Sequence, residues 1–185
     1  VLELRARFDE EANRRWKAQL EEEGVKVVLG ISDMKVHAKL CVIKKREFNR
    51  VKQYGFVSTG NLNENTARYY GDYTLLTTNR SILADINRIF DYLENPVKII
   101  AGLKNCRILP VSPLSMRSTM LSLLDKEIRI ARKKKPAEVI VKLNSLVDNT
   151  LIEKLYAAAK AGVNIKMVIR GICGAYTQQK AFKGI

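Results

Sequence analysis

Two periods of hydrophobic and polar positions alternate along the chain. Apolar residues recur every three or four positions in four stretches, which predicts helices over 9–24, 80–96, 113–136 and 148–162. Shorter runs with alternating apolar positions and many β-branched or aromatic residues predict strands between them. These strands are expected at VLELRA (1–6), VKVVLG (25–30), KVHAKLCVIKK (35–45), YGFVSTG (54–60), YTLLTT (73–78), CRILPVS (106–112), AEVIVKLNSL (137–146) and VNIKMVIRG (163–171).

Polar and glycine residues at the ends of these helices supply start and stop signals. Ser81 and Asp148 precede apolar helical runs and are predicted to cap them, because their side-chain oxygens accept from free backbone N–H groups. Gly24 and Gly162 follow such runs, and Pro96 prevents continuation of its own. The pattern predicts an α/β fold.

A weak internal repeat divides the chain in two. EEEGVKVVLG and AKAGVNIKMVIRG both pass from a helix through Gly-Val into a strand. The net charge changes in the same region: of the total of +14, +4 falls on residues 1–104 and +10 on residues 105–185. We therefore predict two α/β domains, over 1–104 and 105–185, each cut short by an end of the chain.

The excess of 33 Lys and Arg over 19 Asp and Glu predicts a polyanionic partner such as nucleic acid, a phospholipid surface or polyphosphate. Three widely spaced cysteines and one histidine give no zinc-ligand spacing, and reduced thiols in a cytoplasmic protein are expected. No apolar run reaches the roughly 18–20 residues that cross a bilayer. Without an initial Met, the chain is expected to be a piece of a larger protein.

The single histidine lies in a predicted strand, two residues before a lysine. Alternation places His37 and Lys39 on one face, with Ala38 on the other, and the next strand is followed by Asn61. If these strands pair, His37, Lys39 and Asn61 converge on one anion. Imidazole carries a phosphoryl group well, while lysine and asparagine stabilise phosphate oxygens. The residues alone leave packing and catalysis equally open.

Two arginines and a group of tyrosines complete the candidate residues. Arg7 and Arg170 each stand at the end of a predicted strand, where a guanidinium commonly faces phosphate, although an exposed arginine there is also common. ARYYGDY contains Tyr70 among side chains that either pack or stack on a purine.

Several long motifs resemble bacterial polyphosphate kinase of the long-chain type. They are LRARFDEEAN, VHAKLCVI, STGNLNENTARYYGDYTLLT, FDYLENP and LVDNTLIEKLYAAAKAGVNIKMVIRGIC, in that family's order over nearly the whole chain. The resemblance implies two domains similar to phospholipase D, a cytoplasmic or membrane-associated homo-oligomer, and ATP, ADP and inorganic polyphosphate as partners, with nucleic acid not expected.

The resemblance also implies roles for individual residues. His37 matches the histidine that ATP phosphorylates, and Tyr70 and Arg170 match nucleotide-contacting positions. Arg7 matches an arginine at the Mg²⁺ site. Because guanidinium has no free lone pair, we expect Arg7 to hold phosphate oxygens that themselves bind Mg²⁺. A second essential histidine is expected beyond residue 185, so this piece alone is predicted to be inactive.

Two alternatives remain at this point. The first is a phosphodiesterase of the phospholipase D type, either nuclease or lipase; Lys44 argues against it, since it stands where that motif has an aspartate. The second is a basic nucleic-acid-binding module formed by residues 105–185.

Overall fold

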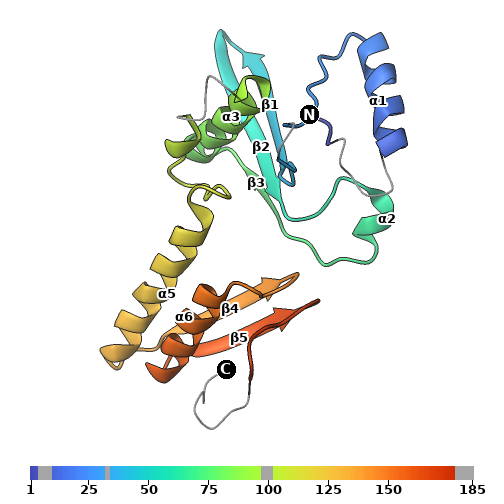
Figure 1. The fold of residues 1–185 in the computed structure, drawn as a ribbon. Helices are drawn as coiled ribbons and strands as arrows, with labels where there is room; N and C mark the ends of the chain where they lie inside the picture. The colour runs from blue at the N-terminus through green and yellow to red at the C-terminus, as the bar shows by residue number, and fades with distance from the viewer. Residues whose placement is uncertain (4–9, 32–33, 97–101, 178–185) are drawn as a thin grey trace. The chain divides into compact units, whose positions relative to one another are not determined.

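The structure is a computed structural model that describes residues 1–3, 10–31, 34–96 and 102–177. The chain divides into two compact units, Val1–Val111 and Ser112–Ile185. Helices and strands alternate in both (Figure 1), so the predicted α/β class is confirmed.

The first unit is built on a three-stranded antiparallel sheet in the order β1-β2-β3. Its elements are α1 (Glu10–Glu22), β1 (Lys39–Glu47), β2 (Arg50–Ser58), α2 (Glu64–Ala67), β3 (Thr74–Thr77) and α3 (Arg80–Glu94). A two-residue turn, Phe48–Asn49, with both φ angles positive, joins β1 to β2 and matches the twist of the hairpin. The resulting register places Lys39 opposite Ser58, so the start of β1 meets the end of β2.

Helix α3 covers one face of this sheet, as the ribbon shows (Figure 1). Its apolar stripe places Leu83 and Ile86 in the interior, at 2% and 0% exposure. Leu83 lies directly over Gly55: a Cβ on Gly55 would come within 2.8 Å of Leu83 Cδ2 and 2.4 Å of the Cys41 carbonyl oxygen. The glycine therefore permits helix and sheet to approach closely.

The second unit is a helix-covered pair of parallel strands. Its elements are α5 (Met116–Arg132), β4 (Glu138–Leu143), α6 (Asn149–Lys160) and β5 (Asn164–Ile169). The strands pair from Glu138–Asn164 to Leu143–Ile169. Apolar residues of all four elements form one core, which includes Leu124, Ile128, Leu155, Ala158 and Ile165. Because parallel strands end together, the residues after Leu143 and Ile169 lie at one edge of the sheet.

The predicted helix signals are partly confirmed. Asp148 caps α6 by accepting a hydrogen bond from the Leu151 N–H, and Gly162 follows that helix with φ of +94°. Ser81 was the wrong cap for α3: the Asn79 side chain accepts from the N–H groups of Ser81 and Ile82. The helix begins at Arg80, where the predicted range also begins, so only the identity of the cap was wrong.

Two strand predictions were wrong within the described residues, and a third falls partly outside them. Residues 25–30 make only an isolated bridge, between Leu29 and Leu2, and residues 4–6 of the first predicted strand lie outside the described residues. Residues 106–112 form no strand. Instead, the N–H groups of Arg107, Ile108 and Leu109 all donate to one carboxylate oxygen of Asp85. These N–H groups are therefore not available for a sheet.

Candidate functional site

His37 and Lys39 meet at the start of β1. The structure corrects the prediction that both lie in a strand: β1 begins at Lys39, and His37 belongs to the extended segment before it. Glu3 holds this segment by accepting from the Val36 N–H at 2.5 Å. The Lys39 ammonium lies 2.9 Å from His37 Nδ1 and 3.2 Å from Nε2, and it donates to the His37 carbonyl oxygen at 2.9 Å.

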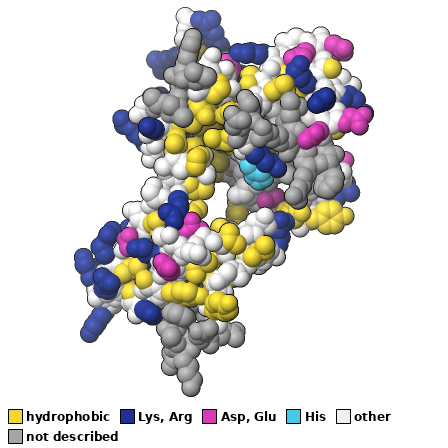
Figure 2. All heavy atoms as spheres, in the orientation of Figure 1, with side chains coloured by type: hydrophobic (Ala, Val, Ile, Leu, Met, Phe, Trp, Pro, Cys, Tyr) yellow, Lys and Arg dark blue, Asp and Glu magenta, His cyan; other side chains and the backbone are white. Residues whose placement is uncertain are grey.

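The prediction that Lys39 and Ala38 lie on opposite faces is confirmed. Ala38 and Leu40 line a small recess together with Phe90 and Leu93 of α3. The alternation along the strand therefore directs Lys39 to the opposite face, which α3 does not cover. The single histidine is visible at the molecular surface with a basic side chain beside it (Figure 2). The packing interpretation of His37 is not supported, because its side chain is exposed.

The surroundings favour the neutral form of the His37 ring. Partial loss of hydration lowers its pKa, and the positive charges of Lys39 and Lys35 lower it further. The Lys39 ammonium lies near both ring nitrogens, and a neutral ring can accept from it through one of them. A neutral ring carries a lone pair on one nitrogen, which is the form needed for nucleophilic attack.

A network of small polar side chains surrounds the end of β2. Ser58 Oγ lies 2.8 Å from Thr74 Oγ1 and accepts from the Gly60 N–H at 3.2 Å. Thr59 Oγ1 donates to Asp72 Oδ1 at 3.1 Å and accepts from the Tyr73 N–H at 3.0 Å. This network fixes the chain that follows β2 against the chain that enters β3.

Asp72 is a site residue for which sequence reasoning proposed no role. Its carboxylate occupies the space beside Gly60, where a Cβ would come within 2.4 Å of Asp72 Oδ2. Partial burial lowers the pKa of Lys39, and the negative charge of Asp72 opposes that change. Asp72 therefore helps to keep Lys39 charged. The only sequence signal was an acidic residue directly before the predicted strand 73–78.

The other predicted residues of the first unit are placed less tightly. Asn61 is exposed three residues after β2, and none of the described contacts of His37 or Lys39 involves it. Tyr70 follows α2 with its side chain 46% exposed. Arg7 lies outside the described residues. The structure therefore brings His37 and Lys39 into contact, whereas convergence of Asn61 stays a prediction.

Arg170 stands at the carboxyl edge of the sheet in the second unit, directly after β5. Its Nε and Nη2 donate to Asn144 Oδ1 at 3.0 and 2.6 Å. The backbones are joined as well, since the Arg170 N–H donates to the Leu143 carbonyl at 3.2 Å and the Gly171 N–H to the Asn144 carbonyl at 2.7 Å. Crevices at this edge of α/β sheets are common ligand sites. Sequence reasoning found Arg170 but not Asn144.

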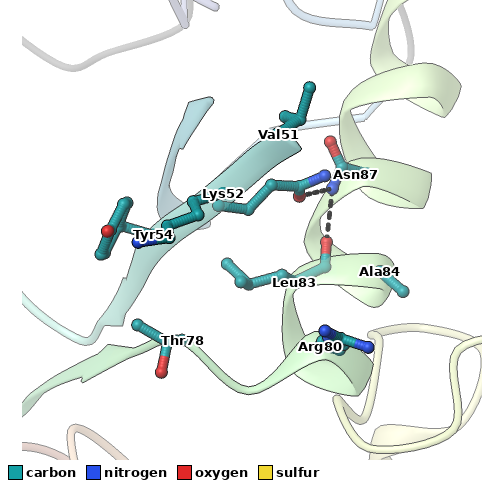
Figure 3. A pocket seen from close by; sticks show the side chains of 9 residues that line it. Val51, Lys52, Tyr54, Thr78, Arg80, Leu83, Ala84 and Asn87 are labelled. Carbon is teal, nitrogen blue, oxygen red and sulfur yellow. Dashed lines mark hydrogen bonds between the residues drawn. The ribbon is translucent and has the colours of Figure 1, made fainter. Parts of the chain in front are cut away.

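A pocket of the first unit is separate from these groups. It has a volume of about 530 Å³ and lies between β2 and α3 (Figure 3). Asn87 lines this pocket, and its Nδ2 donates to Gln53 Oε1 at 2.9 Å and to the Leu83 carbonyl at 2.7 Å, which links α3 to β2. Because the pocket is on the face that α3 covers, it does not contain the His37 and Lys39 side chains.

The second unit also presents exposed basic residues around the end of α5, where Figure 2 shows many Lys and Arg side chains. They are Arg129, Arg132, Lys133, Lys134 and Lys135. The charges agree with the expectation of a polyanionic partner. No helix within the described ranges is both long and apolar enough to cross a membrane.

The donor set available for Mg²⁺ is small. In the part of the chain that the structure describes, no three His, Cys, Asp or Glu side chains form a group able to hold a metal ion. Mg²⁺ prefers several oxygen ligands and commonly reaches phosphoryl-transfer sites on the substrate phosphates. The described residues therefore do not form a resident Mg²⁺ site by themselves.

Comparison with known proteins identifies close relatives. Curated polyphosphate kinases of Vibrio vulnificus (strain YJ016) and Escherichia coli (strain K12) are 47% and 42% identical to the chain over 173 residues. Each match covers 94% of this chain but only 24% and 25% of those proteins. The chain thus spans about a quarter of the length of these relatives.

A solved structure and two family models agree with these matches. The crystal structure of polyphosphate kinase from Porphyromonas gingivalis is 34% identical, with a TM-score of 0.77, and covers 99% of this chain and 30% of that one. Residues 1–99 match the model of polyphosphate kinase C-terminal domain 1, and residues 109–184 that of C-terminal domain 2. The chain belongs to the polyphosphate kinase family and corresponds to parts of its two C-terminal domains.

Proposed function

We propose that the protein transfers the γ-phosphate of ATP reversibly to inorganic polyphosphate through a phosphohistidine at His37. One observation carries this proposal: the Lys39 ammonium lies 2.9 Å from Nδ1 of an exposed His37 whose pKa is lowered. Family membership supports the choice of ATP and polyphosphate as substrates. The activity belongs to the intact protein, because this chain matches about a quarter of its relatives.

In the first step, the unprotonated ring nitrogen of His37 attacks the γ-phosphorus of Mg-ATP. A nitrogen–phosphorus bond forms as the bond from that phosphorus to the β,γ-bridging oxygen breaks. ADP leaves with the electron pair. Lys39 stabilises the negative charge on the transferred oxygens, and the hydrogen bonds of Ser58 with Thr74 and of Thr59 with Asp72 hold the chain around the end of β2 in place.

In the second step, a terminal phosphate oxygen of polyphosphate attacks the same phosphorus. The nitrogen–phosphorus bond breaks, His37 recovers its lone pair, and the polymer is longer by one unit. The transfer is reversible because the bonds broken and formed are all energy-rich. Arg170 and Tyr70 are proposed to contact the nucleotide, Arg7 to hold phosphate oxygens that bind Mg²⁺, and Asn61 to donate to the transferred phosphate.

The basic residues at the end of α5 are proposed to attract the polymer. Lys133, Lys134 and Lys135 are exposed and adjacent in sequence, so their charges add in the field that a polyanion meets. Polyphosphate binding is accordingly expected to weaken steeply with salt. We further propose that the intact protein is a homo-oligomer in the cytoplasm or at a membrane surface.

The direct test uses the intact protein and ATP labelled in the γ-phosphate. Phosphohistidine is acid-labile and stable in alkali, so the label should be lost in acid and kept in base. Peptide mapping should place it on His37. A label that survives acid would indicate a phosphoester on another side chain and would contradict the proposal.

Replacing Lys39 with methionine is expected to move the pH dependence of this first step. Lys39 lowers the pKa of His37 because a nearby positive charge disfavours the protonated ring. Its removal raises that pKa, so the ring becomes protonated at a higher pH and the acid limb of the rate profile moves upward. The maximum rate should also fall, by about 10- to 100-fold, because the transferred oxygens lose a charge partner.

Lys35→Met is the matched control for that experiment. Lys35 also lowers the pKa of His37, but it makes no hydrogen bond to the ring among the described contacts. The control should move the acid limb in the same direction and keep the maximum rate. Rapid-quench measurement of the phosphorylation rate from pH 5 to 9 compares the two, and an unmoved limb in Lys39→Met would contradict the electrostatic role.

A further inference from the structure

The β1–β2 hairpin is longer than the third strand of its sheet. β1 pairs with β2 as far as Glu47 and Arg50, whereas β3 pairs with β2 only from Gly55 to Ser58. Residues 44–52, which we call the hairpin tip, therefore form a two-stranded end beyond β3, as the cyan ribbon shows (Figure 1). The tip lies at the opposite end of β1 from Lys39.

An aromatic side chain stands at the apex of the hairpin tip. Phe48 is 99% exposed, so it makes almost no contact within the described chain. Phe48 and Asn49 have φ angles of 44° and 62°, the left-handed conformation of a two-residue hairpin turn, which presents the ring at a defined position. The nearby Val51 is exposed as well. The apex therefore offers apolar surface to a partner.

Cationic side chains flank this apolar apex. All of them are exposed: Lys44, Lys45, Arg46, Arg50 and Lys52. The single acidic residue of the tip, Glu47, binds Lys45 at 2.9 Å and Lys52 at 2.6 Å through its two carboxylate oxygens. Within the described ranges, the other three cations form no ion pair. Their charges are available to an external anion.

An apolar apex between cations selects among the possible polyanionic partners. Polyphosphate would neutralise the cations but has no apolar part to cover Phe48. A single-stranded nucleic acid would stack a base on the ring but would leave the aliphatic side chain of Val51 uncovered. An anionic bilayer surface satisfies both features, because its phosphates attract cations and its interface accepts aromatic and aliphatic side chains.

We infer that the hairpin tip contacts the surface of an anionic phospholipid bilayer, with Phe48 inserted among the headgroups and the flanking cations on their phosphates. The inference goes beyond the transfer reaction and does not depend on the phosphohistidine. Lys39 and Glu47 are the two ends of β1, so the site is roughly 25 Å from the tip at about 3.3 Å per residue. One ring and a few cations predict reversible binding that weakens with salt.

The test measures sedimentation of the intact protein with vesicles of phosphatidylglycerol and phosphatidylcholine. We expect the native protein to bind the mixed vesicles and to bind pure phosphatidylcholine much more weakly. Phe48→Asn should weaken the partition onto mixed vesicles by about 10-fold or more, because the apolar area of the ring is lost. Asparagine suits the left-handed turn, so this variant keeps the hairpin.

Three further variants make the result specific. Leu76→Asn removes a 76% exposed apolar side chain of the same sheet outside the tip, and it should leave the partition unchanged. Phe48→Trp should show more fluorescence quenching by brominated lipids than the native protein does, which reports insertion directly. Arg46→Gln combined with Arg50→Gln should weaken the partition and reduce its salt dependence.

A partition of Phe48→Asn within about twofold of the native value would overturn the inference, as would failure of the native protein to bind the mixed vesicles. Equal losses of single-stranded DNA binding and vesicle binding in Phe48→Asn would assign the tip to nucleic acid and overturn it too. None of these results affects the phosphohistidine proposal, which depends on labelling of His37. Absence of that label would remove the proposed function and leave the lipid contact standing.

Discussion

Replacement of His37 with alanine should abolish both phosphorylation of the intact protein by ATP and polyphosphate synthesis. We expect the rate of each to fall by about 10³-fold or more, the effect of removing the nucleophile from an enzyme with a covalent intermediate. His37 is the only histidine of this chain, and its lowered pKa and its contact with Lys39 favour the neutral form of the ring, which is the nucleophilic one. The measurement is incorporation of label from γ-labelled ATP, with product assayed separately.

His37→Gln separates chemistry from structure. The glutamine amide can still accept from the Lys39 ammonium, but it forms no stable bond to phosphorus. Both variants should keep the melting temperature of the native protein, since the His37 side chain is exposed and fills no core position. If the acid-labile label persisted in either variant, the phosphoryl carrier would have to be another residue. Hydrolysis of DNA or lipid without ATP would favour the phosphodiesterase alternative.

The sequence predicted the parts of the fold that depend on local pattern. Both strands of the β1–β2 hairpin were predicted from alternating apolar positions, whereas their pairing, which brings Lys39 opposite Ser58, came from the structure. The Asp148 cap and the glycine after α6 were also predictable, because both act on neighbouring backbone groups. The same reasoning predicted Ser81 as the cap of α3, but Asn79, two residues earlier, caps it, and the apolar pattern does not distinguish the two positions.

Predictions failed where a distant side chain determines the backbone. Residues 106–112 have the apolar content of a strand, yet the N–H groups of Arg107, Ile108 and Leu109 are bound by Asp85, more than twenty residues earlier. Periodicity carries no information about such a contact. Residues 25–30 also have the composition of a strand, with several β-branched residues. In the described part of the chain, however, only Leu29 forms a bridge with a partner, so the run does not become a strand there.

The candidate site shows the same contrast between what local sequence pattern predicts and what contacts between distant residues determine. His37 and Lys39 could be found because they are two residues apart, and Arg170 because it ends a recognisable strand. Asp72 and Asn144 act on groups brought near by strand pairing, at separations of 33 residues from Lys39 and 26 from Arg170, so only the folded chain shows them. The residues proposed to carry chemistry were therefore more predictable than the side chains that act on them.

Asp85→Asn should cause the largest loss of stability in the first unit. The Asp85 side chain is fully buried, with one oxygen accepting from three backbone N–H groups at 2.7 to 3.0 Å and the other from Arg88 Nη1 at 2.7 Å. Asparagine keeps one acceptor and turns an NH₂ group toward the other set of donors. We expect a loss of about 2–4 kcal/mol, because buried, charge-assisted hydrogen bonds are lost and donors are left unpaired.

Hydrogen exchange on the intact protein measures this loss where it occurs. The amides of Arg107, Ile108 and Leu109 should lose about 30- to 1,000-fold of their protection, which is the same free energy expressed as an equilibrium constant. Asp91→Asn is the matched control: it makes the same change on the same helix at an exposed carboxylate, and should alter protection there by less than about 0.5 kcal/mol. Equal exchange in both variants would show that Asp85 does not hold this segment.

The pH dependence of the stability difference between the native protein and Asp85→Asn tests whether the charge of Asp85 causes that difference. Burial alone would raise the pKa of Asp85, but the three backbone N–H groups and Arg88 outweigh it and lower the pKa below its ordinary value. A carboxyl whose pKa is lower in the folded state adds its full stability above the unfolded pKa of about 3.9, and loses it as pH falls through the folded value. The gap between native protein and Asp85→Asn should therefore be constant near neutral pH and close only in acid. A gap that stayed open after protonation would mean that shape, rather than charge, makes Asp85 necessary.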